Sequence, residues 1–260
     1  MNAGVAQLFD LSERVAIVTG ATKGLGRSMA EGLAGAGASI VVVSRDQDAC
    51  TRVADEITAS TGQVALGVAC HMGEWDALPA LVETVRDRFG RIDILVNNAG
   101  INPGPVSVID MSQEYLDKLF AVNVKGPVRL AGLVAPVMAE GAKGSIINVA
   151  TVGAYAGGPN VGAYTSAKAA LINFTKVMAR EWASMGIRVN ALSPGPFNST
   201  MMRGTAKLDP EFSTRAGAAT LQRRVAECDE IIGATVYLAS DASSYVTGED
   251  HVVAGGMLRS

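Results

Sequence analysis

Tyr164 and Lys168 lie four residues apart, a spacing that places both side chains on one face of a helix. A free tyrosine has a pKa of about 10, and a cation within about 4–6 Å lowers that pKa by roughly 1–3. The two residues are therefore candidates for an acid/base pair in which the lysine tunes the tyrosine toward the working pH. Such a pair can move a proton, but it needs a redox partner to catalyse an oxidation or a reduction.

A glycine-rich turn that begins at Thr19 could hold that partner, because it lies between a β-branched run and a helical pattern. Glycine lets the backbone turn sharply and approach a pyrophosphate, and the N–H groups of the following helix can hold the anion. The glycine spacing is weak by itself in a chain with 29 glycines. Its position between strand and helix predicts a dinucleotide-binding turn. The residues predicted to bind there are Gly20, Thr22, Lys23, Gly24, Leu25 and Gly26.

The residues after the second β-branched run bear on which dinucleotide is bound. Dinucleotide folds place an acid there for the adenosine ribose, or an arginine for a 2′-phosphate. Here Ser44 and Arg45 follow the run, and Arg45 can meet a phosphate with its guanidinium while Lys23 adds a second charge. This pattern predicts a preference for NADP(H) over NAD(H). The alternative is that Asp46 holds the ribose and Arg45 is an ordinary surface residue.

Two further polar residues are candidates for the same site. Thr151 follows a predicted strand, at the end where open parallel sheets bind ligands. Its hydroxyl could hold a substrate carbonyl beside Tyr164, or it could only cap a turn. Asn123 interrupts a helical run, where asparagine is a poor helix former. It could hold a water behind Lys168, or it could be a helix asparagine whose hydrogen bonds are satisfied locally.

The elements that must position these residues alternate between β-branched runs and helical patterns. This alternation predicts an α/β fold in one domain over residues 1–260, a doubly wound, Rossmann-like parallel sheet of about seven strands. The segment 194–224 fits no strand–helix unit, so we predict an irregular substrate loop there, with Phe197, Met201, Met202 and Phe212 as an apolar lid. The predicted strands are Val15–Thr19, Ser39–Val43, Val64–Val68, Ile92–Val96, Ser145–Val149, Ile187–Leu192 and His251–Ala254. The predicted helices are Leu25–Ala36, Asp46–Ser60, Glu74–Phe89, Gln113–Ala139, Tyr164–Ala183 and Ala226–Ala239.

Composition narrows the classes of function. The chain is 48% hydrophobic with a net charge of −3, which favours a globular protein and argues against one that coats nucleic acid. The longest apolar runs are strand-length, and Met1–Leu11 lacks the basic start of a signal peptide, so we expect no membrane span and a cytoplasmic location. Three scattered cysteines and two histidines predict no disulfide framework and no metal site, with Cys70–His71 as a strand end.

Taken together and in order, these motifs resemble the short-chain dehydrogenase/reductase family over essentially the whole chain. The resemblance implies that Tyr164 is the general acid/base, that Lys168 binds the nicotinamide ribose and lowers the pKa of Tyr164, and that Asn123 anchors a proton-relay water. It also implies further cofactor contacts from Met72, Asn98, Ala99, Gly100, Pro194 and Gly195. The matching pieces are Thr19–Gly26, Asn97–Gly100, Asn123, Tyr164 with Lys168, Pro194–Gly195, Tyr245–Gly248 and Gly255–Gly256.

Three positions depart from the family pattern. Thr151 stands where the family has a serine; it keeps the hydroxyl and adds a methyl group that crowds the substrate. Cys70–Met72 replaces an aspartate near the adenine, and Ala254 replaces an aspartate before the final glycines. None of these changes removes a group from the proposed proton path, so we expect an active enzyme.

The sequence therefore predicts an NADP(H)-preferring oxidoreductase that interconverts a small-molecule ketone and a secondary alcohol by hydride transfer. We expect a homotetramer with no nucleic-acid or membrane partner. One alternative is a 3-oxoacyl (carrier-protein) reductase, for which Arg129 and Arg180 are candidate docking residues. Another is an NAD-dependent sugar or polyol dehydrogenase. A non-catalytic dinucleotide sensor is disfavoured by the intact Tyr164 and Lys168.

Overall fold

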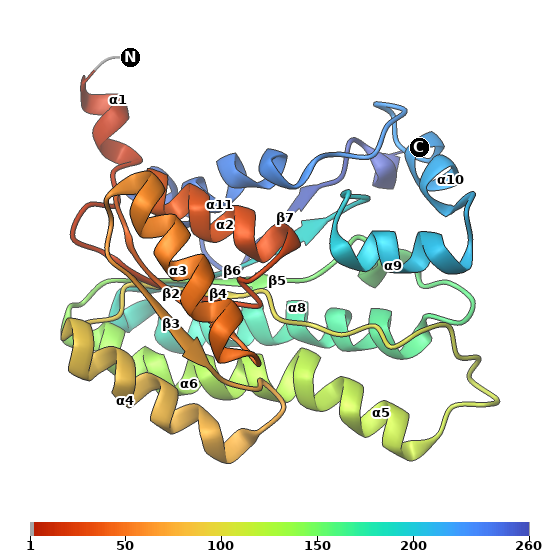
Figure 1. Cartoon of the computed structure of the whole chain (residues 1–260), viewed down its shortest axis with the longest axis horizontal. Helices are drawn as coiled ribbons and strands as arrows, with labels where there is room; N and C mark the ends of the chain where they lie inside the picture. Colours follow the sequence, from red (N-terminus) through yellow and green to blue (C-terminus); the bar gives the residue numbers. More distant parts are fainter. Residues whose placement is uncertain (1–2, 260) are drawn as a thin grey trace.

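A single seven-stranded parallel sheet organises the chain, with strand order β3-β2-β1-β4-β5-β6-β7 (Figure 1). The computed structural model describes residues 3–259. Met1 and Asn2, which begin the segment predicted to lack a signal peptide, and Ser260 lie outside the described residues. The strands are β1 (Val15–Thr19), β2 (Ser39–Ser44), β3 (Ala65–Ala69), β4 (Ile94–Asn97), β5 (Gly144–Val149), β6 (Ile187–Pro194) and β7 (Asp250–Val253). The predicted doubly wound α/β fold is confirmed.

Helices cover both faces of the sheet (Figure 1). The α-helices are α1 (Ala3–Leu8), α2 (Gly24–Gly35), α3 (Gln47–Thr61), α4 (Leu78–Phe89), α5 (Gln113–Phe120), α6 (Gly126–Glu140), α7 (Gly153–Ala156), α8 (Gly162–Trp182), α9 (Thr200–Leu208), α10 (Phe212–Ala218) and α11 (Ile232–Ala239). Short 3-10 turns occur at η1 (Trp75–Ala77), η3 (Ala183–Met185), η4 (Cys228–Ile231), η5 (Asp241–Ser243) and η6 (Met257–Arg259), and η2 (Ala121–Lys125) is a π-helix.

The two faces of the sheet pack against different helices because successive strand side chains point in opposite directions. In β1, Ala16 and Val18 join the core that α2, α3 and α11 cover. Val15 and Ile17 join the core beneath α4, α6 and α8. All five residues of β1 are buried, as expected for a central strand covered on both faces.

The structure departs from the predicted elements at several places, among them the predicted helix Ala226–Ala239, which is α-helical only from Ile232 because the 3-10 turn η4 precedes α11. The predicted helix Gln113–Ala139 is divided into α5 and α6 by the π-helix around Asn123, a feature that helical periodicity does not reveal. The segment 194–224, predicted to be irregular, contains α9 and α10; Ser199 caps α9 by accepting a hydrogen bond from the Met202 N–H at 3.2 Å. The short helices α1 and α7 were not predicted.

A search for membrane-spanning segments within residues 3–259 finds no helix that combines the required length with sufficient apolar character.

Candidate active site

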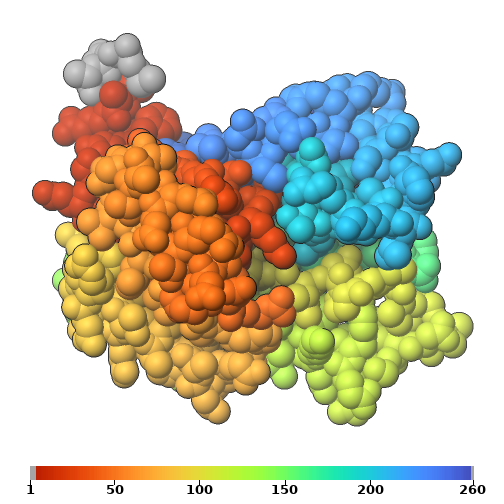
Figure 2. Space-filling view, viewed as in Figure 1, coloured from red at the N-terminus to blue at the C-terminus, as the bar shows by residue number. Residues whose placement is uncertain are grey.

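A pocket of about 450 Å³ opens at the carboxyl ends of β1, β4, β5 and β6. The strand order reverses between β1 and β4, and ligands of open α/β sheets bind in the crevice at such a reversal. Figure 2 shows the surface hollowed between the red and orange N-terminal units and the cyan segment around α9. The structure brings together every residue predicted to bind the cofactor: Gly20, Thr22, Lys23, Gly24, Leu25, Gly26, Ser44, Arg45, Met72, Asn98, Ala99, Gly100, Tyr164, Lys168, Pro194 and Gly195.

The glycine turn after β1 has no room for larger residues at its key positions. Gly20 and Gly24 have φ values of +68° and +56°, a region that favours glycine. A Cβ atom added to Gly26 would lie 2.3 Å from the Asn98 Nδ2 and 2.4 Å from the Gly20 carbonyl oxygen. The glycines therefore let the start of α2 approach both the turn and the end of β4.

Hydrogen bonds fasten the end of β4 to this turn. The Thr19 hydroxyl accepts from the backbone N–H groups of Asn98 and Ala99, each at 3.0 Å, and donates to the Val96 carbonyl at 3.3 Å. The Asn98 side chain in turn donates to the carbonyl oxygens of Thr19 at 2.9 Å and Gly20 at 3.3 Å. Asn98 thus holds the turn in place as well as lining the pocket.

At the end of β2, Ser44 and the exposed Arg45 face the same pocket. The Thr22 hydroxyl donates to the Ser44 hydroxyl at 3.3 Å, which joins the glycine turn to this strand. The Asp46 carboxylate is engaged elsewhere, because it caps α3 by accepting from the Ala49 N–H at 3.1 Å. Arg45, by contrast, lines the pocket, and Asp46 is not among the lining residues.

The end of β3 contributes His71 and Met72 to the pocket. The strand itself ends at Ala69, so Cys70 and His71 follow it directly. The His71 Nδ1 accepts a hydrogen bond from the Gly73 N–H at 3.1 Å. Among residues 3–259, no three His, Cys, Asp or Glu side chains gather in a way that could hold a metal ion.

Tyr164 and Lys168 both lie on α8 and line the pocket, together with Thr151 from the end of β5. Lys168 is buried, and its Nζ donates to the Val149 carbonyl oxygen at 2.7 Å. Burial lowers the pKa of Lys168 to about 8. Burial also raises the pKa of Tyr164 to about 12, and the hydrogen bond with Thr151 acts against this rise without cancelling it.

The net shift of the Tyr164 pKa is therefore upward, and the lowering predicted from Lys168 does not set its direction in this structure. Loss of water around the phenol disfavours its anion and outweighs the neighbouring polar groups. The Thr151 hydroxyl also accepts from the Gly153 N–H at 3.3 Å. Thr151 accordingly shows both arrangements considered from the sequence: it caps the turn into α7 and stands beside the tyrosine.

Asn123 is fully buried in the π-helix and does not line the pocket. Its side chain accepts from the Ile101 N–H and donates to the Ile101 carbonyl, both at 2.8 Å. Gly100 lies next to this contact: a Cβ atom added there would be 3.3 Å from the Asn123 Oδ1 and 3.4 Å from the Lys168 Nζ. Asn123 and Lys168 thus both lie close to Gly100, and the asparagine holds the loop that follows β4.

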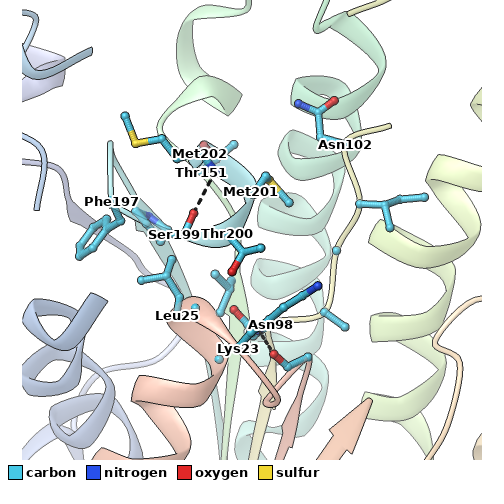
Figure 3. A pocket seen from close by; sticks show the side chains of 18 of the residues that line it. Lys23, Leu25, Asn98, Asn102, Thr151, Phe197, Ser199, Thr200, Met201 and Met202 are labelled. Carbon is cyan, nitrogen blue, oxygen red and sulfur yellow. Dashed lines mark hydrogen bonds between the residues drawn. The ribbon is translucent and has the colours of Figure 1, made fainter. Parts of the chain in front are cut away.

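The segment 194–224 supplies the predicted lid residues, although α9 and α10 make it more regular than expected. All four residues predicted for the lid, Phe197, Met201, Met202 and Phe212, line the pocket, and Phe197 is also buried in the core. Figure 3 shows Phe197, Met201 and Met202 around the pocket. A Cβ atom added to Gly24 would lie 3.6 Å from the Thr200 N, so the start of α9 rests on the glycine turn. A serine before a helical run is an N-cap signal that could have revealed α9. Other lining residues missed from the sequence include Ile101, Asn102, Val122, Val152, Pro196, Ser199, Thr200, Thr205, Ala216 and Met257.

Comparisons with known proteins agree with this site. A family model described as enoyl-(acyl carrier protein) reductase matches residues 20–258. The chain is 36% identical over 257 residues to dehydrogenase/reductase SDR family member 4 from Bos taurus, covering 99% of this chain and 91% of that protein. The relative of the same name from Caenorhabditis elegans is 37% identical over 248 residues, covering 94% of this chain and 95% of that protein.

Solved structures show the same fold with nicotinamide dinucleotides bound. One is a gluconate 5-dehydrogenase from Burkholderia cenocepacia in complex with NADP and tartrate, with a TM-score of 0.94, 33% identity and coverage of 98% of this chain and 99% of that chain. Another is L-sorbose reductase from Gluconobacter frateurii complexed with NADPH and L-sorbose, with a TM-score of 0.92, 31% identity and coverage of 97% and 99%.

A matched pair of substitutions in α2 tests the crowding at the glycine turn. Gly26→Ala should destabilise the protein by about 1–3 kcal/mol, because its methyl group collides with the turn. It should also weaken NADP(H) binding. In contrast, Gly35→Ala in the same helix meets open space and should stabilise it by about 0.4–1 kcal/mol. Urea unfolding and a titration with NADPH measure both effects; a Gly26→Ala variant as stable as its parent would contradict the argument.

Proposed function

The chain belongs to the short-chain dehydrogenase/reductase family, and from that premise we propose that it interconverts a ketone and a secondary alcohol, with NADP(H) preferred over NAD(H). The observation that carries this proposal is the meeting of Thr151, Tyr164 and Lys168 with the glycine turn in one pocket. A proton donor, a hydroxyl and a dinucleotide cradle are together what carbonyl reduction requires of the protein.

In the direction of reduction, the bound nicotinamide supplies the hydride. Thr151 and Tyr164 bind the carbonyl oxygen, and Tyr164 donates the proton. A phenol whose pKa is about 12 is protonated at neutral pH and so is ready to donate. Lys168, with a pKa of about 8, keeps most of its charge at neutral pH and stabilises the phenolate that forms.

Asn123 acts as a positioning residue in this proposal. Its two hydrogen bonds hold Ile101, and through it the loop that places Gly100 against the Lys168 Nζ. We also propose that the same corner holds the water through which Lys168 passes protons from solvent.

The experiment that tests the proposed function is Tyr164→Phe. The variant should lose on the order of 100-fold or more in kcat, because the phenol oxygen is the proposed proton donor. Its Kd for NADPH should stay nearly unchanged, since the ring remains. Tyr155→Phe is the matched control: this exposed tyrosine donates to Asp250 and lies outside the pocket, so its loss should leave kcat unaltered. A Tyr164→Phe variant that kept more than about a tenth of kcat would overturn the assignment.

The lowered pKa of Lys168 predicts a pH dependence. The ammonium is charged below pH about 8 and neutral above it, so kcat/KM for ketone reduction should fall as the pH rises through about 8. Tyr164 cannot cause this fall, because its own pKa is about 12. Lys168→Arg keeps a charge throughout this range and should move the fall to higher pH. A flat profile of kcat/KM, with NADPH binding checked at each pH, would show that the charge of Lys168 is not required.

The proposed coenzyme preference rests on the end of β2. Ser44 and Arg45 line the pocket there. Because position 44 is a serine, no carboxylate at this position repels a 2′-phosphate. Asp46 is committed to the N-terminus of α3. A charge-assisted hydrogen bond is worth about 1.5–3 kcal/mol, so NADP(H) should bind roughly 10- to 100-fold more tightly than NAD(H).

The double variant Ser44→Asp with Arg45→Ala should reverse this coenzyme preference, because it replaces the phosphate partner with a carboxylate that suits a ribose. Asp46→Asn is the control; asparagine keeps the helix cap, so the preference should not change. The measurement is the Kd of each protein for NADPH and NADH. Equal affinities in the parent, or tighter NADH binding, would make Arg45 an ordinary surface residue.

We further propose a homotetramer, although the small residues of α8 do not supply its contact surface. Ala163 and Ala167 pack inside the chain against Leu119 and Val124, and so they are not free for a partner. Exposed apolar side chains on α5 and α8 support the proposal instead: Leu116, Phe174 and Val177 are 37–39% exposed. A cytoplasmic location is also proposed, on the ground that Cys50, Cys70 and Cys228 are all unpaired.

The carrier-protein alternative loses one of its supports. The Arg129 guanidinium stacks over the Trp75 ring at 4.9 Å, and its Nε is buried. An arginine held in this way is a poor docking residue for an acidic carrier.

A further inference from the structure

We infer that the substrate is a neutral carbonyl compound with a largely apolar body, and that the pocket rejects carboxylates such as sugar acids. This inference rests on the proposed interconversion of ketones and alcohols, and it adds the class of molecule that reaches Tyr164. It follows from which side chains line the end of the pocket opposite the glycine turn, and from where the nearby charges are directed.

The end of the pocket beyond Thr151 is closed by α9, α10 and the loop after β4. Figure 3 shows Met202 and Thr151 at this end, with Met201 between them and Asn102, whereas Lys23, Leu25 and Asn98 lie at the opposite end. Methionine is unbranched and polarisable, so it adapts to apolar ligands of irregular shape. All pocket-lining residues of α9 and α10 are uncharged: Thr200, Met201, Met202, Thr205, Phe212 and Ala216.

The basic side chains that do line the pocket belong to its cofactor side. Lys23 is on the glycine turn, Arg45 follows β2 and His71 follows β3. Lys168 is held by the Val149 carbonyl oxygen beneath the tyrosine. No Asp or Glu occurs among the lining residues within the described part of the chain.

The arginines nearest this end are directed away from the pocket. Arg203 of α9 donates to the Asn198 carbonyl oxygen at 2.6 Å and to its side-chain oxygen at 3.1 Å. Arg215 of α10 forms ion pairs with Asp209 and Glu211. Both arginines are exposed, and neither lines the pocket.

A carboxylate in this end of the pocket would therefore lose water without gaining a cation. Burying an unpaired charge is strongly unfavourable, whereas a ketone with an apolar body loses little and gains contacts with Met201, Met202 and Phe212. Asn102 adds no cation either: its Oδ1 is buried without a hydrogen-bond partner, and an amide oxygen is an acceptor that cannot pair with a carboxylate. The shared fold does not transfer a preference for sugar acids, because selectivity depends on these lid residues.

Three ketones of nearly equal shape test the inference: para-isopropylacetophenone, para-acetylbenzamide and para-acetylbenzoate. Their Kd values are measured by calorimetry on the wild-type enzyme loaded with NADP+, where no reduction can occur. The isopropyl compound should bind most tightly, and the carboxylate at least about 100-fold more weakly than the amide, because only the carboxylate carries a charge. The inference is overturned if the carboxylate binds as well as the amide, if the amide binds better than the isopropyl compound, or if none of the three binds.

The same measurement separates this inference from the proposed function. Selective binding of the neutral ketones, without NADPH oxidation when the reduced enzyme meets them, would sustain the pocket's selectivity and overturn the proposed reaction. Turnover of para-acetylbenzoate at the rate of the amide would do the reverse.

A matched pair of variants tests whether the missing cation is the cause. Thr205 lies on α9 and lines the pocket, and it is only part-buried, so a longer side chain can be accommodated. Thr205→Lys should strengthen para-acetylbenzoate binding by about 10-fold relative to the amide. Thr205→Gln, of similar length and without charge, should leave the ratio unchanged. An equal effect of both variants would overturn the charge argument.

Discussion

The joint between the ends of β1 and β4 is the constraint on which the site depends. Thr19 and Asn98 exchange hydrogen bonds across it through both side chains, and Gly26 packs against it without space for a methyl group. A parallel sheet that reverses its strand order must separate two loops at this point, which creates the crevice. The joint keeps those two loops close enough to share one ligand. The loop after β4 continues from this joint, and it carries Gly100 past Lys168 and Ile101 to its hydrogen bond with Asn123.

Burying Tyr164 and Lys168 disfavours their charged forms, and polar groups around the pair partly offset that penalty. Burial disfavours both charged forms: it raises the pKa of Tyr164 to about 12 and lowers that of Lys168 to about 8. The Val149 carbonyl partly compensates the buried ammonium, and the Thr151 hydroxyl partly compensates the phenol. In this environment the phenol of Tyr164 is protonated, and the ammonium of Lys168 loses its proton more readily than that of a free lysine. That state suits proton donation to a carbonyl, and the reverse reaction would need an added positive charge near the phenol.

Repeating local patterns could be predicted from the sequence. The strands, the helices on both faces and the glycine turn follow from periodicity and from the position of Gly20 to Gly26 between strand and helix. The rest of the cofactor-side lining, such as Met72 and Pro194, was expected from the family resemblance. Features that depend on tertiary contacts could not. In the π-helix, the Asn123 side chain accepts a hydrogen bond from Ile101, and the backbone of Phe197 pairs with Ala226; both contacts join segments that are distant in the sequence. The direction of the pKa shift at Tyr164 depends on burial, which spacing alone does not report.

The two ends of the pocket therefore differ in which elements hold their lining residues. At the cofactor end, the lining residues follow the carboxyl ends of strands, and the hydrogen bonds between the strands fix the positions of their backbones. At the other end, α9 and α10 lie between β6 and α11, outside the strand–helix repeat, and their contacts are with one another and with the glycine turn. Side chains such as Met201 and Thr205 can change there without disturbing a strand. A substitution at such a position changes the charge that a substrate meets, while the sheet and the proton donor stay as they are.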